Sequence, residues 1–194
     1  MVKKRVNWGL IGFFVEVLGL TLWVGGLLVI IGIIIPTVFN SFGMEPAGRF
    51  LRKVFDGYGY MNLGILVVLG LSAGLRHRSY GLERHPVLSL SKAELGLLVG
   101  MMIATVSIVG VLGPKAVALQ ELAFEAVSKP EKEAAYADFF RLHMMVRGLH
   151  MVNLGMAAAL LIMKLRRPVF HSMSTVPPPS FNAGNMSPKQ EETR

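Results

Sequence analysis

The sequence predicts an all-α, multi-pass membrane protein: an antiparallel four-transmembrane-helix bundle with amphipathic outer helices. Hydrophobic residues make up 53% of the 194 residues and charged residues only 16%, which is more apolar than a soluble domain usually is. A helix crosses a bilayer with about 20 mostly apolar residues, and four stretches meet that length. The basic residues lie in short clusters between these stretches, so we interpret the net charge of +8 as a topology signal and expect no nucleic-acid partner.

The transmembrane domain is predicted over residues 1–167, with spans at about residues 12–36, 58–75, 94–113 and 143–163. The first apolar stretch follows Lys3, Lys4 and Arg5 and is too long for a cleaved signal peptide, so we expect an uncleaved signal anchor. From Pro168 the composition turns to proline, serine and asparagine, which predicts a disordered cytoplasmic tail over residues 168–194. No internal repeat is apparent.

The segments outside the membrane are predicted to be helical as well. Residues 46–55 place Phe50, Leu51, Val54 and Phe55 on one stripe, which indicates a short interfacial helix. The Gly113-Pro114 pair should kink or end the third span. A helix that begins near Pro130 is expected to run without a break into the fourth span.

Charge flanking the spans predicts the orientation, because cytoplasmic loops carry the excess of lysine and arginine. The side that holds both chain ends is the richer one, with basic residues at positions 3–5, 76–92 and 164–167. We therefore expect a protein of the cell (inner) membrane with both termini in the cytoplasm. Its expected partners are the lipid bilayer and, as open alternatives, other membrane subunits or further copies of the same chain.

Two carboxylates near the ends of spans are predicted to be structural. Glu16 should lie near the cytoplasmic surface, within reach of the basic residues at positions 3–5. Glu94 completes a capping box with Ser91 at the start of the third span. The chain has no cysteine, so any metal site must use histidine, carboxylate, amide or methionine ligands.

The fourth span carries the most informative polar face. At helical spacing His143, Arg147 and His150 share one side, and Asn153 adjoins it. Lipid would penalise that face, so it should point into the bundle. We interpret these four residues as a candidate cofactor site for haem b or copper, with His143 and His150 as the candidate metal ligands.

The two histidines lie about 10 Å apart along one helix, so a second helix would have to supply the opposite ligand. The alternative is structural: Arg147 pairs with Asp56, Asn62 is a structural polar residue at the same outer level of the second span, and the histidines hydrogen-bond to their neighbours. No Walker loop, zincin motif or nucleophile elbow is present, so no catalytic residue is predicted.

Several short stretches resemble one family: Leu22-Trp23-Val24-Gly25-Gly26-Leu27, Pro36-Thr37-Val38-Phe39, and Phe140-Arg141-Leu142-His143 with Asn153 downstream. Over about residues 10–165 the chain resembles the transmembrane protein 205-like family, domain of unknown function 4149, which is distantly similar to the CopD-like superfamily. The resemblance implies a small helical membrane fold and an association with copper or haem. Val146 and His150 stand where the family pattern has a small residue and asparagine, so whether His143 or His150 matches the family histidine stays open.

The leading prediction is a non-enzymatic membrane protein of the transmembrane protein 205-like type, holding haem b or copper in the outer half of the bundle. One alternative is a non-catalytic membrane subunit or scaffold of a larger complex. Another is a transporter or a haem-linked oxidoreductase. These functions differ in what they require, because a cofactor holder needs the histidines whereas a scaffold needs its packing faces.

Overall fold

The structure is a computed structural model that describes residues 8–80 and 91–174, with side chains described over residues 10–75 and 91–166. Its described part is helical apart from short connections. The elements in order are α1 (Trp8–Val29), η1 (Ile30–Ile34), α2 (Ile35–Ser41), α3 (Met44–Tyr80), α4 (Lys92–Ser107), η2 (Ile108–Leu112), α5 (Gly113–Glu125) and α6 (Lys129–Ser174).

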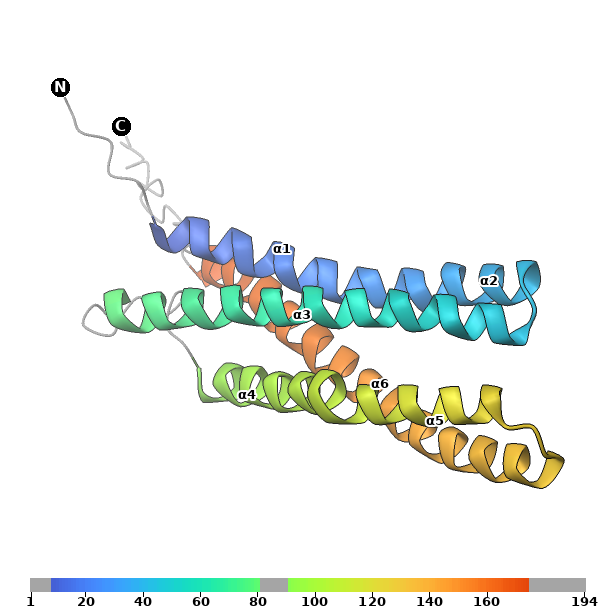
Figure 1. Ribbon diagram of the computed structural model, residues 1–194. Helices are drawn as coiled ribbons and strands as arrows, with labels where there is room; N and C mark the ends of the chain where they lie inside the picture. The colour runs from blue at the N-terminus through green and yellow to red at the C-terminus, as the bar shows by residue number, and fades with distance from the viewer. Residues whose placement is uncertain (1–7, 81–90, 175–194) are drawn as a thin grey trace, which may run out of the picture.

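These elements form four rods that are long and apolar enough to cross a membrane, at Leu10–Ser41, Met44–Leu75, Lys92–Glu125 and Lys129–Arg166. The predicted all-α bundle of four membrane helices is therefore confirmed. Figure 1 shows that α1 begins and α6 ends at the same end of the bundle, so successive rods run in opposite directions. Below, the end where α1 begins is called the terminal end and the opposite one the outer end.

The first and third rods each contain one π-helical turn, η1 and η2, instead of a break. Pro36 and Pro114 are the second residues of the helices that follow these turns. A proline lacks the amide N–H that would bond to a carbonyl one turn earlier. Just before each proline a backbone hydrogen bond spans five residues instead of four: the amide of Ile35 bonds to the carbonyl of Ile30, and the amide of Gly113 bonds to the carbonyl of Ile108. Neither proline therefore ends its span.

The outer segments differ in one respect from the sequence-based expectation. Residues 46–55 are not a separate interfacial helix, because α3 runs unbroken from Met44 through the second span. The predicted continuous fourth helix is confirmed by α6, which begins at Lys129. Of the predicted tail, residues 168–174 belong to α6, and residues 175–194 lie outside the described residues.

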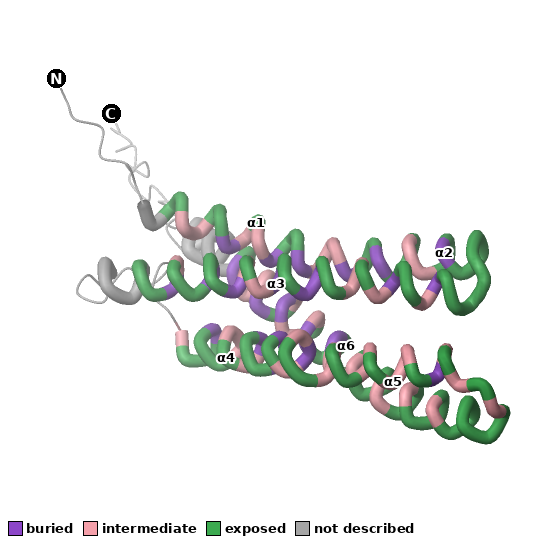
Figure 2. The backbone as a smooth tube through the Cα atoms, viewed as in Figure 1, coloured by how far each residue is buried: buried purple, intermediate pink, exposed green. Residues whose placement is uncertain are grey.

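The core is a narrow apolar column where the four rods meet, visible as the buried stretches in Figure 2. Its most completely buried large apolar side chains are Leu20, Trp23, Leu27, Leu69, Met101 and Leu160. Many large apolar side chains point outward, among them Leu18, Val67 and Ile103. Such a surface is a liability in water but suits lipid.

Candidate functional site

Three ionisable side chains meet inside the bundle near its terminal end. The ammonium group of Lys164 on α6 donates hydrogen bonds to Glu16 Oε2 on α1 and to Glu94 Oε1 on α4. The lysine side chain is 3% exposed and each carboxylate side chain 1%. We call these residues the charge triad.

The register of each helix directs the triad inward. On α6 the buried residues Asn153, Ala157, Leu160 and Lys164 follow one another at intervals of four, three and four, which keeps them on one face of the helix. On α1, Glu16 is one turn before the buried Leu20. The same periodicity that builds the core therefore carries charged groups into it.

The triad links helices that do not pack on each other. Among the described residues, α6 packs against both α1 and α4, whereas the backbones of α1 and α4 do not approach each other closely. An ammonium group has three donors and no acceptor, so Lys164 can hold carboxylates on either side of it. Glu16 and Glu94 are joined across the bundle through this one cation.

A second polar layer lies toward the outer end. The imidazole of His150, 8% exposed, lies with its ring centroid 5.5 Å from that of Phe55 and 6.4 Å from that of Tyr58. The hydroxyl of Tyr58 donates to the backbone carbonyl of Trp23 at 2.7 Å. His150 thus reaches from α6 to rings on the diagonally opposite helix α3.

Two buried asparagines belong to the same layer. Asn153 Nδ2 donates to Thr105 Oγ1 at 2.9 Å, which ties α6 to α4. Asn62 is buried on α3. Among the described residues the Oδ1 atoms of Asn62 and Asn153 have no hydrogen-bond partner, so this layer is less fully satisfied than most buried polar groups are.

The polar face predicted on the fourth span does not come together as one site. His143 and Arg147 are both exposed, so the prediction that they point into the bundle is wrong. The His143 ring stacks on Phe139 at 5.5 Å between centroids. Within the described residues there is no group of three or more histidine, aspartate or glutamate side chains that could hold a metal ion, and a two-histidine site does not fit this geometry.

The expected Arg147–Asp56 pair is not formed either. Both residues lie in the described part of the chain and both are exposed, with no ion pair between them. The arginines that do pair across the outer end are Arg49 and Arg52 on α3. Arg147 lies on an exposed side of α6, so its charged end stays at the surface while α5 packs against α6.

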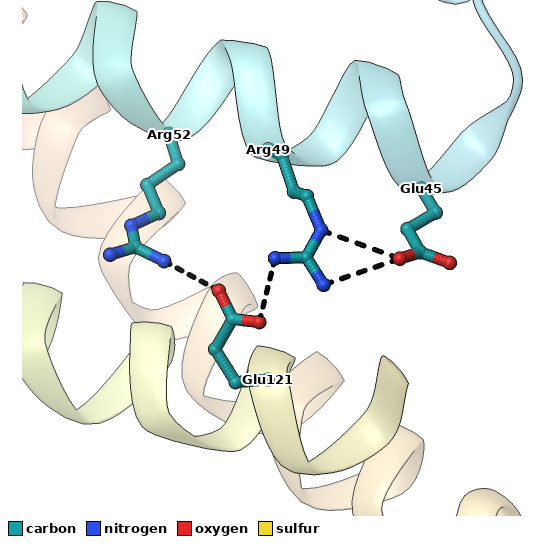
Figure 3. Close-up of polar contacts among 4 residues, drawn as sticks. All are labelled: Glu45, Arg49, Arg52 and Glu121. Carbon is teal, nitrogen blue, oxygen red and sulfur yellow. Dashed lines mark hydrogen bonds and ion pairs between the residues drawn. The ribbon is translucent and has the colours of Figure 1, made fainter. Parts of the chain in front are cut away.

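Figure 3 shows the ion-pair cluster that joins α3 to α5 at the outer end. The two oxygens of Glu121 accept from Arg49 Nη1 at 2.9 Å and from Arg52 Nη1 at 2.7 Å. Arg49 also reaches Glu45 at 3.2 Å and lies 5.3 Å from the ring centroid of Phe124. These groups are partly exposed, so the cluster is a set of surface ion pairs that stabilises the contact between α3 and α5 only modestly.

The two carboxylates predicted to be structural have a different partner from the one expected. The predicted cap is present, since Ser91 Oγ accepts from the Glu94 amide at 3.1 Å. The side chain of Glu94, however, extends to Lys164 instead of folding back on the cap. Glu16 also binds Lys164, and the basic residues at positions 3–5, its expected partners, lie outside the described residues.

Lys164 is the site residue that sequence analysis missed, because it was grouped with the flanking Arg166 and Arg167 as a topology signal. A clue was available in the register: Lys164 is four residues after Leu160 and eleven after Asn153, so it shares their helical face. A charge on the buried face of a membrane helix is a candidate functional residue.

These features define an integral multi-pass membrane protein with ionisable groups in its core. A family model described as Domain of unknown function (DUF4149) matches residues 18–125, more than half of the chain, and the protein belongs to that family. Glu94 lies within the matched segment, whereas Glu16 and Lys164 lie outside it. No curated protein and no solved structure matches the chain.

Proposed function

We propose that this protein is a non-enzymatic membrane protein that binds and exchanges protons at the charge triad as part of proton-coupled transport. One observation carries the proposal: three ionisable side chains from three helices meet with at most 3% exposure inside a mainly apolar bundle. Ionisable groups inside membrane segments are rare and typically mark ion pathways and proton relays.

The energetics argue against a purely structural role for the triad. Removing charges from water costs several kcal/mol per ion, by order of magnitude, and apolar residues of similar volume often stabilise a core equally well or better. The column around Leu20, Trp23 and Leu160 could continue through this level without any charge. Keeping three ionisable groups there suits a role that depends on their titration.

Protonation of the triad would change how strongly the helices that carry it hold together. A proton bound to one carboxylate removes its negative charge and weakens its hold on Lys164, while the ammonium group stays with the other carboxylate. Glu16 is on α1 and Glu94 is on α4. The carboxylate that takes up the proton therefore determines whether the remaining ion pair of Lys164 holds α6 to α4 or to α1. Release of the proton restores both ion pairs.

The orientation is part of the same proposal. Lysine and arginine are concentrated at the terminal end, which supports a cytoplasmic location for the triad, both termini and the loop between α3 and α4. Reporters fused near residue 5, within residues 77–90 and after Arg167 should behave as cytoplasmic, and those near Met44 and Lys129 should not. A reporter at residue 78 that proves external would overturn this orientation and place the triad near the outer surface of the membrane.

The direct test is infrared difference spectroscopy of the purified protein in lipid during acidification. A protonated carboxyl group absorbs apart from carboxylate, and we expect a band that is lost or halved in Glu16→Gln and in Glu94→Gln. Glu125→Gln is the matched control, since Glu125 is exposed outside the bundle core. Vesicles that carry the protein and an internal pH dye should acidify inside faster than protein-free vesicles when acid is added outside. Glu16→Gln and Glu94→Gln should each slow this internal acidification.

A parent protein with no such band and no proton flux would remove the proposal and favour a non-catalytic scaffold. A band without flux would also exclude transport, because the triad would then titrate without exchanging protons across the membrane. The control variant must match the parent in both measurements.

A second candidate, haem b or copper binding, follows from the resemblance to transmembrane protein 205-like and CopD-like proteins, and the burial of the His150 imidazole favours it. Against it, His143 is exposed and the hydroxyl of Tyr58 is already bonded to Trp23. An absorbance spectrum with metal analysis of the purified protein tests it. A bound cofactor should be lost in His150→Ala and not restored in His150→Gln, whereas a colourless, metal-free parent rules it out.

A further inference from the structure

The bundle consists of two hairpins, residues 8–80 and 91–174, and their first rods carry the same residues at matching positions. The identical pairs, each separated by 78 positions, are Glu16 and Glu94, Leu20 and Leu98, Ile30 and Ile108, Gly32 and Gly110, and Pro36 and Pro114. The π-helical turns Ile30–Ile34 and Ile108–Leu112 have the same separation. The match therefore extends to the local backbone.

The second rods, α3 and α6, match as well, but with a separation of 91 positions. The identical pairs are Leu51 and Leu142, Gly57 and Gly148, Asn62 and Asn153, Leu63 and Leu154, Gly64 and Gly155, Leu69 and Leu160, and Arg76 and Arg167. The larger separation means that the outer part of the second hairpin, made of α5 and the start of α6, is longer. A repeat with two different separations has no fixed period, which is why it is not apparent in the sequence alone.

Burial and packing agree with the residue matches. The matched pairs in which both members are buried are Glu16 and Glu94, Trp23 and Met101, Leu27 and Thr105, Ile30 and Ile108, Gly59 and His150, Asn62 and Asn153, Leu66 and Ala157, Leu69 and Leu160, and Ala73 and Lys164. Between the hairpins α1 packs against α6 and α3 against α4, while among the described residues the diagonal pairs α1–α4 and α3–α6 have no close backbone approach. Exchanging the hairpins preserves this arrangement, as a two-fold rotation about the bundle axis would.

We infer that Glu16 and Glu94 form a pseudo-two-fold carboxylate pair that a lysine from either hairpin can bridge, at position 164 or at position 73. The two carboxylates are matched residues, so they face the axis in equivalent ways. Lys164 touches both of them. Its match in the first hairpin is Ala73, which is 5% exposed and lies on the helix diagonally opposite α6. The inference rests on the packing of the triad and not on proton binding.

The test moves the lysine across the axis. Lys164→Ala should lower the melting temperature and the yield of monodisperse protein in detergent, because two buried carboxylates lose their shared cation. It also leaves space at the axis. Ala73→Lys combined with Lys164→Ala should recover most of both losses, since the new side chain enters that space from the opposite helix.

Gly74→Lys combined with Lys164→Ala is the matched control, because Gly74 adjoins Ala73 in sequence but is exposed, and it should recover nothing. The recovery by Ala73→Lys should disappear when Glu16 and Glu94 are both changed to glutamine. Failure of Ala73→Lys to recover more than the Gly74 control would overturn the inference, as would a Lys164→Ala variant that matches the parent. Both readouts are independent of proton flux, so they can succeed or fail separately from the transport proposal.

Discussion

Replacing Lys164 by methionine is the perturbation whose cost the structure defines most directly. Methionine keeps the length and apolar stem of lysine but has no charge and no N–H donor. Glu16 and Glu94, each 1% exposed, then lose the ammonium group that both of them bind. Removing one partner of a buried ion pair typically costs about 3–5 kcal/mol, and here two carboxylates lose the same partner.

For a protein of this size about 1 kcal/mol shifts the melting temperature by roughly 2–4 °C, so the predicted loss is about 6–20 °C. The emission of the buried Trp23 during heating in detergent reports the transition. Lys115→Met is the matched control, since Lys115 is exposed and its loss should change stability by less than about 0.5 kcal/mol. A Lys164→Met variant that melts with the parent would show that the triad contributes nothing to the fold and would refute the electrostatic argument.

The same argument has a companion prediction. If Glu16→Gln and Glu94→Gln are added to Lys164→Met, neutral amides replace both carboxylates, so the negative charges that Lys164 balanced are also removed. The triple variant should recover a large part of the lost melting temperature. A triple variant less stable than Lys164→Met alone would contradict this.

Three smaller effects can be measured in the same melting assay. Thr105→Val removes the acceptor of Asn153 Nδ2 and should cost about 1–3 kcal/mol, whereas an unchanged melting temperature would show that the amide finds another partner. Gly59→Leu should cost about 1–3 kcal/mol through overpacking, because even a Cβ at this position would lie 2.9 Å from Val109 Cγ2; a neutral variant would mean that η2 can move aside. Arg147→Ala should change stability by less than about 0.5 kcal/mol, since Arg147 is exposed without a partner among the described residues, and a large loss would indicate a contact that this arrangement does not contain.

Most of the fold was predictable because it depends on local properties of the chain. The length and apolar character of the four rods follow from residue order, and so does the unbroken start of α6 at Lys129. The Pro36 and Pro114 turns were harder, since proline usually ends or kinks a helix. In these two rods a π-helical turn precedes the proline and the chain stays helical through it. A single sequence does not reveal whether a given proline ends a helix, kinks it or is accommodated in this way.

The candidate site was predicted only in part. His150 and Asn153 are buried as expected, whereas His143 and Arg147 are not. Helical spacing in the sequence predicts which residues share a face of a helix. Whether that face is buried depends on which neighbouring rod packs against it at that level of the bundle. Near the outer end α6 has fewer neighbours, so polar side chains there stay exposed.

Hydropathy and flanking charge along the chain are sufficient to establish a four-span helical membrane protein, because the bilayer sets the length and polarity of each span independently of the other spans. Which ionisable groups meet is a different kind of question. Glu16, Glu94 and Lys164 are far apart in the sequence and each has a conventional local explanation, as a surface carboxylate, a cap and a topology signal. Only the packing of α6 between α1 and α4 brings the three together, since contact between distant helices depends on their rotation and register and not on any one segment.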